Sequence, residues 1–105
     1  MNRGEIHQLA DGAKTVLIVQ ADAVTAGAPT VIALPVTTVP QRAGYPLTVA
    51  LQPGDGLTEP AWVKVTAPQM LPRAALVVRL ARLEDDTQTR VDQALLAVLA
   101  LDDPC

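Results

Sequence analysis

The sequence is poor in aromatic residues and cysteine: its 105 residues include no phenylalanine, one tryptophan, one tyrosine and one cysteine. A single cysteine excludes an internal disulfide framework and a metal site built from several cysteines. With so few aromatic rings, the chain cannot stack several nucleobases on one sheet, as RRM-type domains do. Any hydrophobic core must therefore be built from aliphatic side chains.

Charged residues are also scarce, at 18% of the chain, and the net charge is −3, from 8 basic and 11 acidic side chains. This balance lacks the electrostatic footprint of a high-affinity duplex-binding protein, but it allows a short single strand in a local basic cleft. No apolar run reaches the roughly 18 residues of a membrane span, so we expect no membrane partner. The first residues, MNRGEIHQL, are not expected to form a signal peptide, which favours the cytoplasm.

Half of the chain is apolar, which is enough for the core of one small domain. We expect a single domain over residues 1–105, because the sequence has neither a repeat nor a linker. Apolar and β-branched runs predict strands at residues 6–9, 15–19, 30–36, 47–51 and 61–65. Pro35 predicts a bulge or a sheet edge near the end of its strand. Residues 21–29, rich in Ala, Gly and Pro, are expected to form a loop.

The C-terminal part has the clearest pattern. Residues 84–87 (EDDT) place negative charge and capping oxygens where a helix begins. An apolar stripe at helical spacing follows, formed by Val91, Ala94, Leu95, Val98 and Leu101. Residues 74–83 fit a helix or a strand equally well. Short strands followed by one helix predict a mostly β fold, a small antiparallel barrel or curled sheet with a C-terminal α-helix packed on it.

Four segments follow one another in a characteristic order. They are Arg3-Gly4-Glu5-Ile6, residues 16–20 (VLIVQ), residues 30–37 (TVIALPVT), and Arg82-Leu83 with the later residues 91–95 (VDQAL). In this order they resemble the RGEI signature, two central strands, and final strand and helix of the MazF/PemK toxin family. The resemblance implies an SH3-like, CcdB-type β-barrel with a C-terminal helix, which works as a homodimer.

The same resemblance implies the toxin of a type II toxin–antitoxin system. Such toxins are sequence-specific endoribonucleases that cleave single-stranded RNA (mRNA or tRNA) without a metal or another cofactor. A MazE-like antitoxin inhibits them by laying a disordered tail across the active groove. Metal-free cleavage uses the neighbouring 2′-OH as nucleophile, so the protein must supply a base, an acid and donors for the phosphorane oxygens.

Mapped residue by residue, the family's catalytic Arg falls on Lys14, and its catalytic Thr falls on Thr37. Lys14 is expected to stabilise the scissile phosphate as a point charge, without the bidentate fork of Arg, and Thr37 to hydrogen-bond beside it. The Arg of the PemK-like branch falls on Lys64, whereas its carboxylate position is Thr66. Lys64, Thr38 and Arg42 are expected to bind RNA.

The missing carboxylate leaves the general base open. His7, the single histidine, can act as a base at neutral pH; Glu5 and Asp11 are the other candidates. Each proposed site residue also has a structural alternative. The hydroxyl of Thr37 can satisfy backbone groups at a strand end, and the lysines can be solvated surface residues. Arg3 fits an ion pair with a nearby acid, and Trp62 fits a core or dimer contact.

Two further functions remain as alternatives. A catalytically weak or inactive MazF-like paralogue would bind the antitoxin without cleaving RNA. A CcdB-like gyrase poison would share the fold but carry functional residues at its C-terminus, and residues 101–105 (LDDPC) do not match such an end.

Overall fold

The computed structural model describes residues 2–10, 14–39, 48–51 and 60–99. Its elements are β1 (Glu5–Leu9), β2 (Thr15–Ile18), α1 (Asp22–Thr25), β3 (Thr30–Thr37), β4 (Thr48–Ala50), β5 (Trp62–Lys64), β6 (Gln69–Pro72), β7 (Leu76–Arg82) and α2 (Asp85–Leu99). A turn of 3-10 helix at Arg73–Ala75 joins β6 to β7. No helix in the described part of the chain has the length and apolar character needed to cross a membrane.

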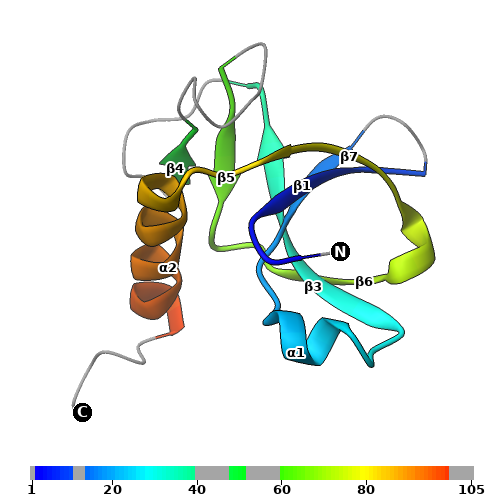
Figure 1. Cartoon of the computed structure of the whole chain (residues 1–105). Coiled ribbons are helices and arrows are strands. Elements are labelled where there is room, and N and C mark those ends of the chain that lie inside the picture. The colour runs from blue at the N-terminus through cyan, green and yellow to red at the C-terminus, as the bar shows by residue number, and fades with distance from the viewer. Residues whose placement is uncertain (1, 11–13, 40–47, 52–59, 100–105) are drawn as a thin grey trace.

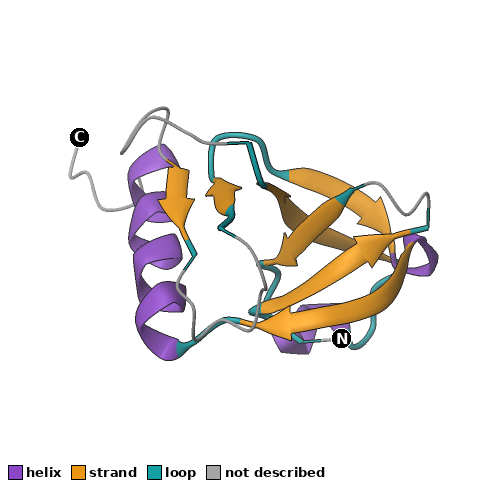
Figure 2. Cartoon of the chain, turned by 90° about the horizontal axis from the view of Figure 1, so that it is seen from above, coloured by secondary structure: helices purple, strands orange, loops and turns teal. Residues whose placement is uncertain are grey.

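The strands form one antiparallel sheet in the order β4-β5-β3-β2-β1-β7, and β6 pairs with β3 beside this path. The sheet curls, and α2 stands at one side of it beside β4 (Figures 1 and 2). The predicted fold class, mostly β with a C-terminal α-helix, is therefore confirmed. Among the described residues the two ends of the path, β4 and β7, do not pair, so the predicted barrel is a curled, open sheet.

Two aliphatic cores lie on opposite faces of β2, because successive side chains of a strand point to opposite sides. Leu17 joins the larger core, which is completed by α2 through Val91 and contains Ile6, Leu34, Val49, Val63, Val65 and Leu83. Val16 and Ile18 join the smaller core with Val31, Ala33 and Leu76. The prediction that the β-branched run of β2 is buried on both faces is thus confirmed.

Strand β3 changes partner along its length, and Pro35 lies at the change. Residues 30–33 pair with β6, whereas Val36 and Thr37 pair with β5. The carbonyl of Ile32 accepts a hydrogen bond from Val19 on β2's side of the strand. Backbone groups of successive residues point to alternate edges of a strand, so the backbone of Pro35, three residues later, points to the other edge. At that edge Pro35 lies between the residues that pair with β5 and those that pair with β6, so its missing N–H removes no hydrogen bond between strands. The two strands diverge at this fork.

The N-terminal signature is tied to α2 by an ion pair. The Arg3 guanidinium contacts both carboxylate oxygens of Asp92, at 2.5 and 3.2 Å, and also donates to the Val19 carbonyl at 3.0 Å. Burial raises the pKa of Asp92, but hydrogen bonds from Arg3 and Gln88 and the Arg3 charge outweigh it and hold the pKa below its ordinary value. Arg3 therefore has the ion-pair role that its structural alternative predicted.

Gly4 occupies a left-handed backbone conformation, with φ of +90°. Its N–H donates to the Ile18 carbonyl, and its carbonyl accepts from Leu83, both at 2.9 Å. A Cβ at this position would lie 2.8 Å from Oε1 of Gln88 on α2. The glycine of the signature is therefore required by the backbone turn and by the close approach of the helix.

The structure overturns one local expectation, adds one strand and resolves one ambiguity. The predicted loop at residues 21–29 contains α1, which is held by distant contacts such as that from Arg73 Nη1 to the Thr25 carbonyl, at 2.9 Å. Strand β6 was not predicted, because two of its four residues are Gln69 and Pro72 and its burial is low. The ambiguous segment at residues 74–83 ends the 3-10 turn and then forms β7.

Candidate functional site

A pocket of about 260 Å³ opens at the fork of β3. Its lining comes from five strands and the residue before β2: Leu9, Lys14, Thr15, Val16, Pro35, Val36, Thr37, Lys64 and Gln69. The fork explains the cavity, because β5 and β6 diverge below Pro35 and leave space between Lys64 and Gln69. The pocket therefore follows from the change of strand partner in β3.

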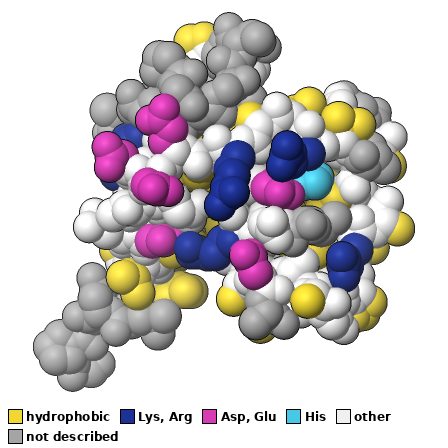
Figure 3. All heavy atoms as spheres, viewed as in Figure 1, with side chains coloured by type: hydrophobic (Ala, Val, Ile, Leu, Met, Phe, Trp, Pro, Cys, Tyr) yellow, Lys and Arg dark blue, Asp and Glu magenta, His cyan; other side chains and the backbone are white. Residues whose placement is uncertain are grey.

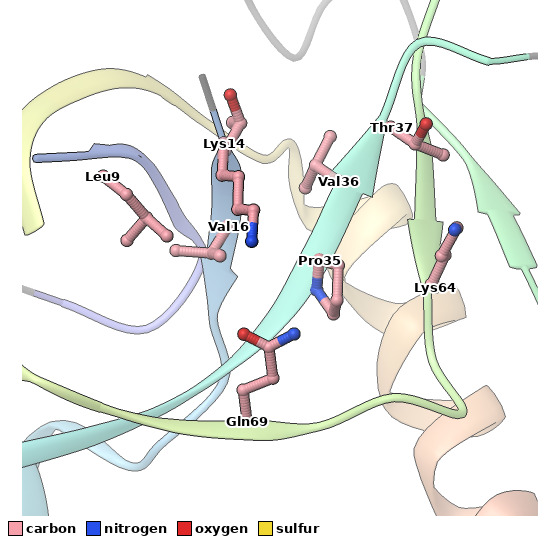
Figure 4. A pocket seen from close by; sticks show the side chains of 9 residues that line it. Leu9, Lys14, Val16, Pro35, Val36, Thr37, Lys64 and Gln69 are labelled. Carbon is pink, nitrogen blue, oxygen red and sulfur yellow. The ribbon is translucent and has the colours of Figure 1, made fainter. Parts of the chain in front are cut away.

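Three residues singled out from the sequence meet in this pocket: Lys14, Thr37 and Lys64. Figure 4 shows Lys14 on one side of Pro35 and Lys64 on the other, with the amide of Gln69 directed into the same space from β6. The sequence contains only two lysines, and both line this one cavity. Residues 50 positions apart in sequence thus supply two ammonium groups to one site.

Lys14 is placed by the hairpin between β1 and β2. Its carbonyl accepts a hydrogen bond from the Leu9 N–H at 2.9 Å, which joins the end of β1 to the residue before β2. The register continues from Gln8 opposite Thr15 to Ile6 opposite Leu17. Because alternate residues share a sheet face, Lys14 projects on the same side as Val16, which forms the floor of the pocket.

Thr37 is the last residue of β3, and its side chain forms a hydrogen bond with a backbone group. Its Oγ1 accepts a hydrogen bond from the Val39 N–H at 3.1 Å, so the structural alternative considered for this residue is present. A threonine hydroxyl has two acceptor lone pairs and one donor hydrogen. The bond to Val39 uses a lone pair, so the hydroxyl hydrogen can still donate to an anion in the pocket.

The charged side chains in the described lining of the pocket are the two lysines. None of the described residues that line it carries a carboxylate or an imidazole. Across the described part of the chain, no acidic side chain forms an ion pair with Lys64. Two ammonium groups, a hydroxyl and an amide around an apolar floor of Leu9, Val16 and Pro35 suit an anion with an organic body, such as a phosphodiester.

His7 does not line the pocket, although Leu9 of the same strand does. It pairs with Val16 across β1 and β2, and its Nε2 is 3.0 Å from Oε1 of the buried Glu5. Figure 3 shows the histidine beside an acidic and a basic side chain; Arg79 Nη1 contacts Glu5 Oε2 at 3.4 Å. Burial raises the pKa of Glu5, but the hydrogen bonds from His7, the Asn2 amide and Arg79 lower it overall.

The remaining predicted residues do not join the pocket in the described structure. Thr38 is exposed just beyond the end of β3 and is not part of the lining, and Thr66 is exposed after β5. Arg42 and Asp11 lie outside the described residues. Sequence reasoning missed Gln69, whose only signal was its place just after Pro68 in a segment without apolar alternation.

Comparison with solved structures shows the same fold in bacterial toxins. A mycobacterial endoribonuclease aligns with a TM-score of 0.85 and 26% identity, covering 99% of this chain and 95% of that one. A mycobacterial endoribonuclease in complex with its cognate antitoxin aligns with a TM-score of 0.84 and 27% identity, covering 96% of each chain. The MazE–MazF structure from Deinococcus radiodurans (Form-I) shares the fold, at a TM-score of 0.78 and 24% identity, with 95% and 96% covered.

A search of curated proteins found no significant match. A family model, in contrast, matches residues 4–99, nearly the whole chain and all the described strands. That model describes the PemK-like, MazF-like toxin of type II toxin–antitoxin systems. The matched segment includes the N-terminal glycine turn, the pocket and α2. The chain therefore belongs to the family of PemK-like and MazF-like toxins of type II toxin–antitoxin systems.

Proposed function

We propose that this chain is a metal-independent, sequence-specific endoribonuclease that cleaves single-stranded RNA, mRNA or tRNA, in the pocket of Lys14, Thr37 and Lys64. The observation that carries the proposal is the meeting of these three residues, from the position before β2, from β3 and from β5, in one cavity. The endoribonuclease named among the similar structures supports the reaction class.

In the proposed reaction, the scissile phosphate lies between the two lysines. The 2′-oxygen attacks phosphorus, a 2′,3′-cyclic phosphate forms, and the bond to the 5′-oxygen breaks. The Lys14 ammonium stabilises the phosphorane charge, and the hydroxyl of Thr37 donates to a non-bridging oxygen. Protonation of the leaving 5′-oxygen completes the step, and an ammonium group of the pocket is the available acid. Lys64 holds the RNA backbone, together with Thr38 and Arg42.

His7 remains one candidate for the general base, beside Glu5 and Asp11, although no described lining residue is an imidazole. The proton of the 2′-OH would have to reach β1 from a substrate held over Val16, its cross-strand neighbour. His7→Gln tests the role. If His7 is the base, the variant should cleave RNA more slowly than the wild type at neutral pH while binding RNA with the same affinity. Equal cleavage rates of the variant and the wild type would exclude this role of His7.

We also propose a cytoplasmic homodimer that is inhibited by a MazE-like antitoxin peptide. The cognate complex of a similar endoribonuclease supports the antitoxin, and acidic side chains of such a peptide suit the two lysines of the pocket. Exposed apolar side chains support a second copy: Ile32 pairs with Met70 across β3 and β6, and Val78 and Leu80 lie on β7. Apolar surface of this kind is typical of subunit contacts.

A second candidate function is an inactive paralogue that binds the antitoxin only. The absence of a carboxylate or imidazole from the described lining favours it. Cleavage rates separate the two functions. The purified protein, Lys14→Ala, Thr37→Ala and Lys64→Ala are incubated with mixed-sequence single-stranded RNA in EDTA. Arg82→Ala is the control, because this exposed cation of β7 lies outside the pocket.

An active toxin predicts cleavage by the wild type and by Arg82→Ala. Lys14→Ala and Thr37→Ala should each lose about 100-fold or more in rate, as removal of a donor to a developing oxyanion does. The inactive paralogue predicts no cleavage by any of these proteins, with antitoxin binding intact. Equal rates in all variants would place the active site elsewhere.

A further inference from the structure

Trp62, the only tryptophan of the chain, is not part of either hydrophobic core. The next residue, Val63, is fully buried in the larger core, as is Val65. Trp62 points to the opposite face of β5 and is only partly buried. A large aromatic side chain outside the core of so small a domain calls for another role.

The register of the sheet places Trp62 beside the pocket. It lies directly opposite Thr37 on β3, and residues opposite each other in an antiparallel pair share a face, with Cβ atoms about 5 Å apart. Lys64, two residues along β5, shares this face as well. Both Thr37 and Lys64 line the pocket, so the indole extends the same surface beyond the cavity.

The two described cross-strand partners of Trp62 have small side chains. On the other side of β5 its partner is Ala50 of β4, which is exposed, and Thr37 is only half-buried. Part of the indole is exposed beside them. Trp62 and Lys64 are two residues apart along the strand, a spacing of about 7 Å. That distance is of the order of one nucleotide.

We propose that Trp62 is a stacking subsite for one nucleobase of the bound RNA, adjacent to the phosphate held by Lys14 and Lys64. The subsite rests on the proposed function, because it extends the same RNA-binding surface. Every base offers a π-face, so a single indole binds a base of a single strand without requiring one sequence. Hydrogen-bonding groups around the pocket, such as the Gln69 amide, are left to read the sequence.

The single tryptophan makes the subsite measurable without cleavage. The probe is a random-sequence decadeoxynucleotide, which lacks the attacking 2′-OH. Tryptophan emission is recorded during titration of the wild type, and anisotropy of the end-labelled probe gives the affinity of each variant. Trp62→Phe keeps an aromatic face, Trp62→Leu removes it, and Gln93→Ala on the exposed side of α2 is the control. Urea unfolding shows whether each variant is folded.

A stacked base predicts quenching of the wild-type emission on binding. Trp62→Leu should bind the probe about 5- to 150-fold more weakly, the range that follows from stacking on one aromatic side chain. Trp62→Phe and Gln93→Ala should bind within about threefold of the wild type. Because Trp62→Phe and Trp62→Leu both fill the site with apolar volume, a purely structural role predicts no difference in affinity between them once folded.

Three results overturn the subsite. Binding with unchanged emission and equal affinity of Trp62→Leu removes the stacking role while leaving the proposed RNA cleavage intact. Failure of the probe to bind the wild type also removes it, since stacking on a base does not need the 2′-OH. If the wild type in addition fails to cleave RNA in the assay described above, the proposed function falls together with the subsite.

Discussion

Gly4→Ala tests whether the N-terminal turn is built as the structure shows. The glycine has φ of +90°, and an added Cβ would meet Gln88 Oε1 at 2.8 Å. Placing an L-residue in a left-handed conformation costs about 1–2 kcal/mol. The Gln88 side chain can move away, but its Nε2 donates to Asp92 Oδ1 at 2.9 Å, and weakening that bond costs about 1 kcal/mol. We therefore expect a loss of about 2–3 kcal/mol in unfolding free energy.

Urea unfolding followed by far-UV circular dichroism measures this loss, with an unchanged m-value showing that the unfolded state is the same. A double-mutant cycle separates its two parts. In a Gln88→Ala background the steric part disappears, so Gly4→Ala should cost only the backbone part, about 1–2 kcal/mol. A cost below about 0.5 kcal/mol in the wild-type background would refute the left-handed turn. An equal cost in both backgrounds would refute the contact with α2.

Three further predictions concern the site, the ion pair and the core. Lys14→Gln and Lys64→Gln should each reduce the slope of log affinity against log salt by about 0.7 for a single-stranded oligonucleotide, measured by anisotropy; unchanged slopes would place the phosphate elsewhere. The stability deficit of Arg3→Met should shrink as the pH falls below about 4, because the lowered pKa of Asp92 stabilises the fold only while the carboxylate is ionised, whereas the part due to the Val19 carbonyl remains; a deficit independent of pH in urea unfolding contradicts this. Leu34→Ala, at a fully buried position, should cost about 2–5 kcal/mol in the same assay.

Sequence patterns predicted the elements whose own residues determine them. The β-branched run of β2 and the apolar stripe of α2 each carry enough local periodicity to identify the element and its buried faces. The one-turn α1 was missed because distant groups hold it: Arg73 reaches the Thr25 carbonyl, and Asp22 accepts from the Arg3 backbone at 2.6 Å. No window of sequence around residues 21–29 contains those contacts.

For the candidate site too, the sequence predicted single residues but not how distant residues come together. Lys14, Thr37 and Lys64 were singled out one by one through the family resemblance, and nothing in their local sequence predicts that they converge. Their convergence depends on the fork in β3, where one partner strand is replaced by another. Pro35 signalled an irregularity at this point, but its consequence, the pocket, needs β6, a strand with little apolar character of its own.

The place of Trp62 in the sheet could not be predicted from its local sequence. A lone tryptophan in an aliphatic chain is usually a core or subunit-contact residue, and both were expected for this one. The register with Thr37 places it outside the two described cores, on the face of β5 opposite to the buried Val63. Which face a residue of a three-residue strand occupies depends on pairing, and pairing is set by the whole sheet.

Mass spectrometry of the fragments that the purified wild type releases from single-stranded RNA in EDTA tests whether this pocket cleaves RNA through the neighbouring 2′-OH without a metal. Such cleavage gives fragments ending in a 2′,3′-cyclic phosphate or 3′-phosphate, each paired with a fragment that begins with a 5′-hydroxyl. Intact RNA at high protein concentration, or fragments with a 5′-phosphate and 3′-hydroxyl, would contradict it.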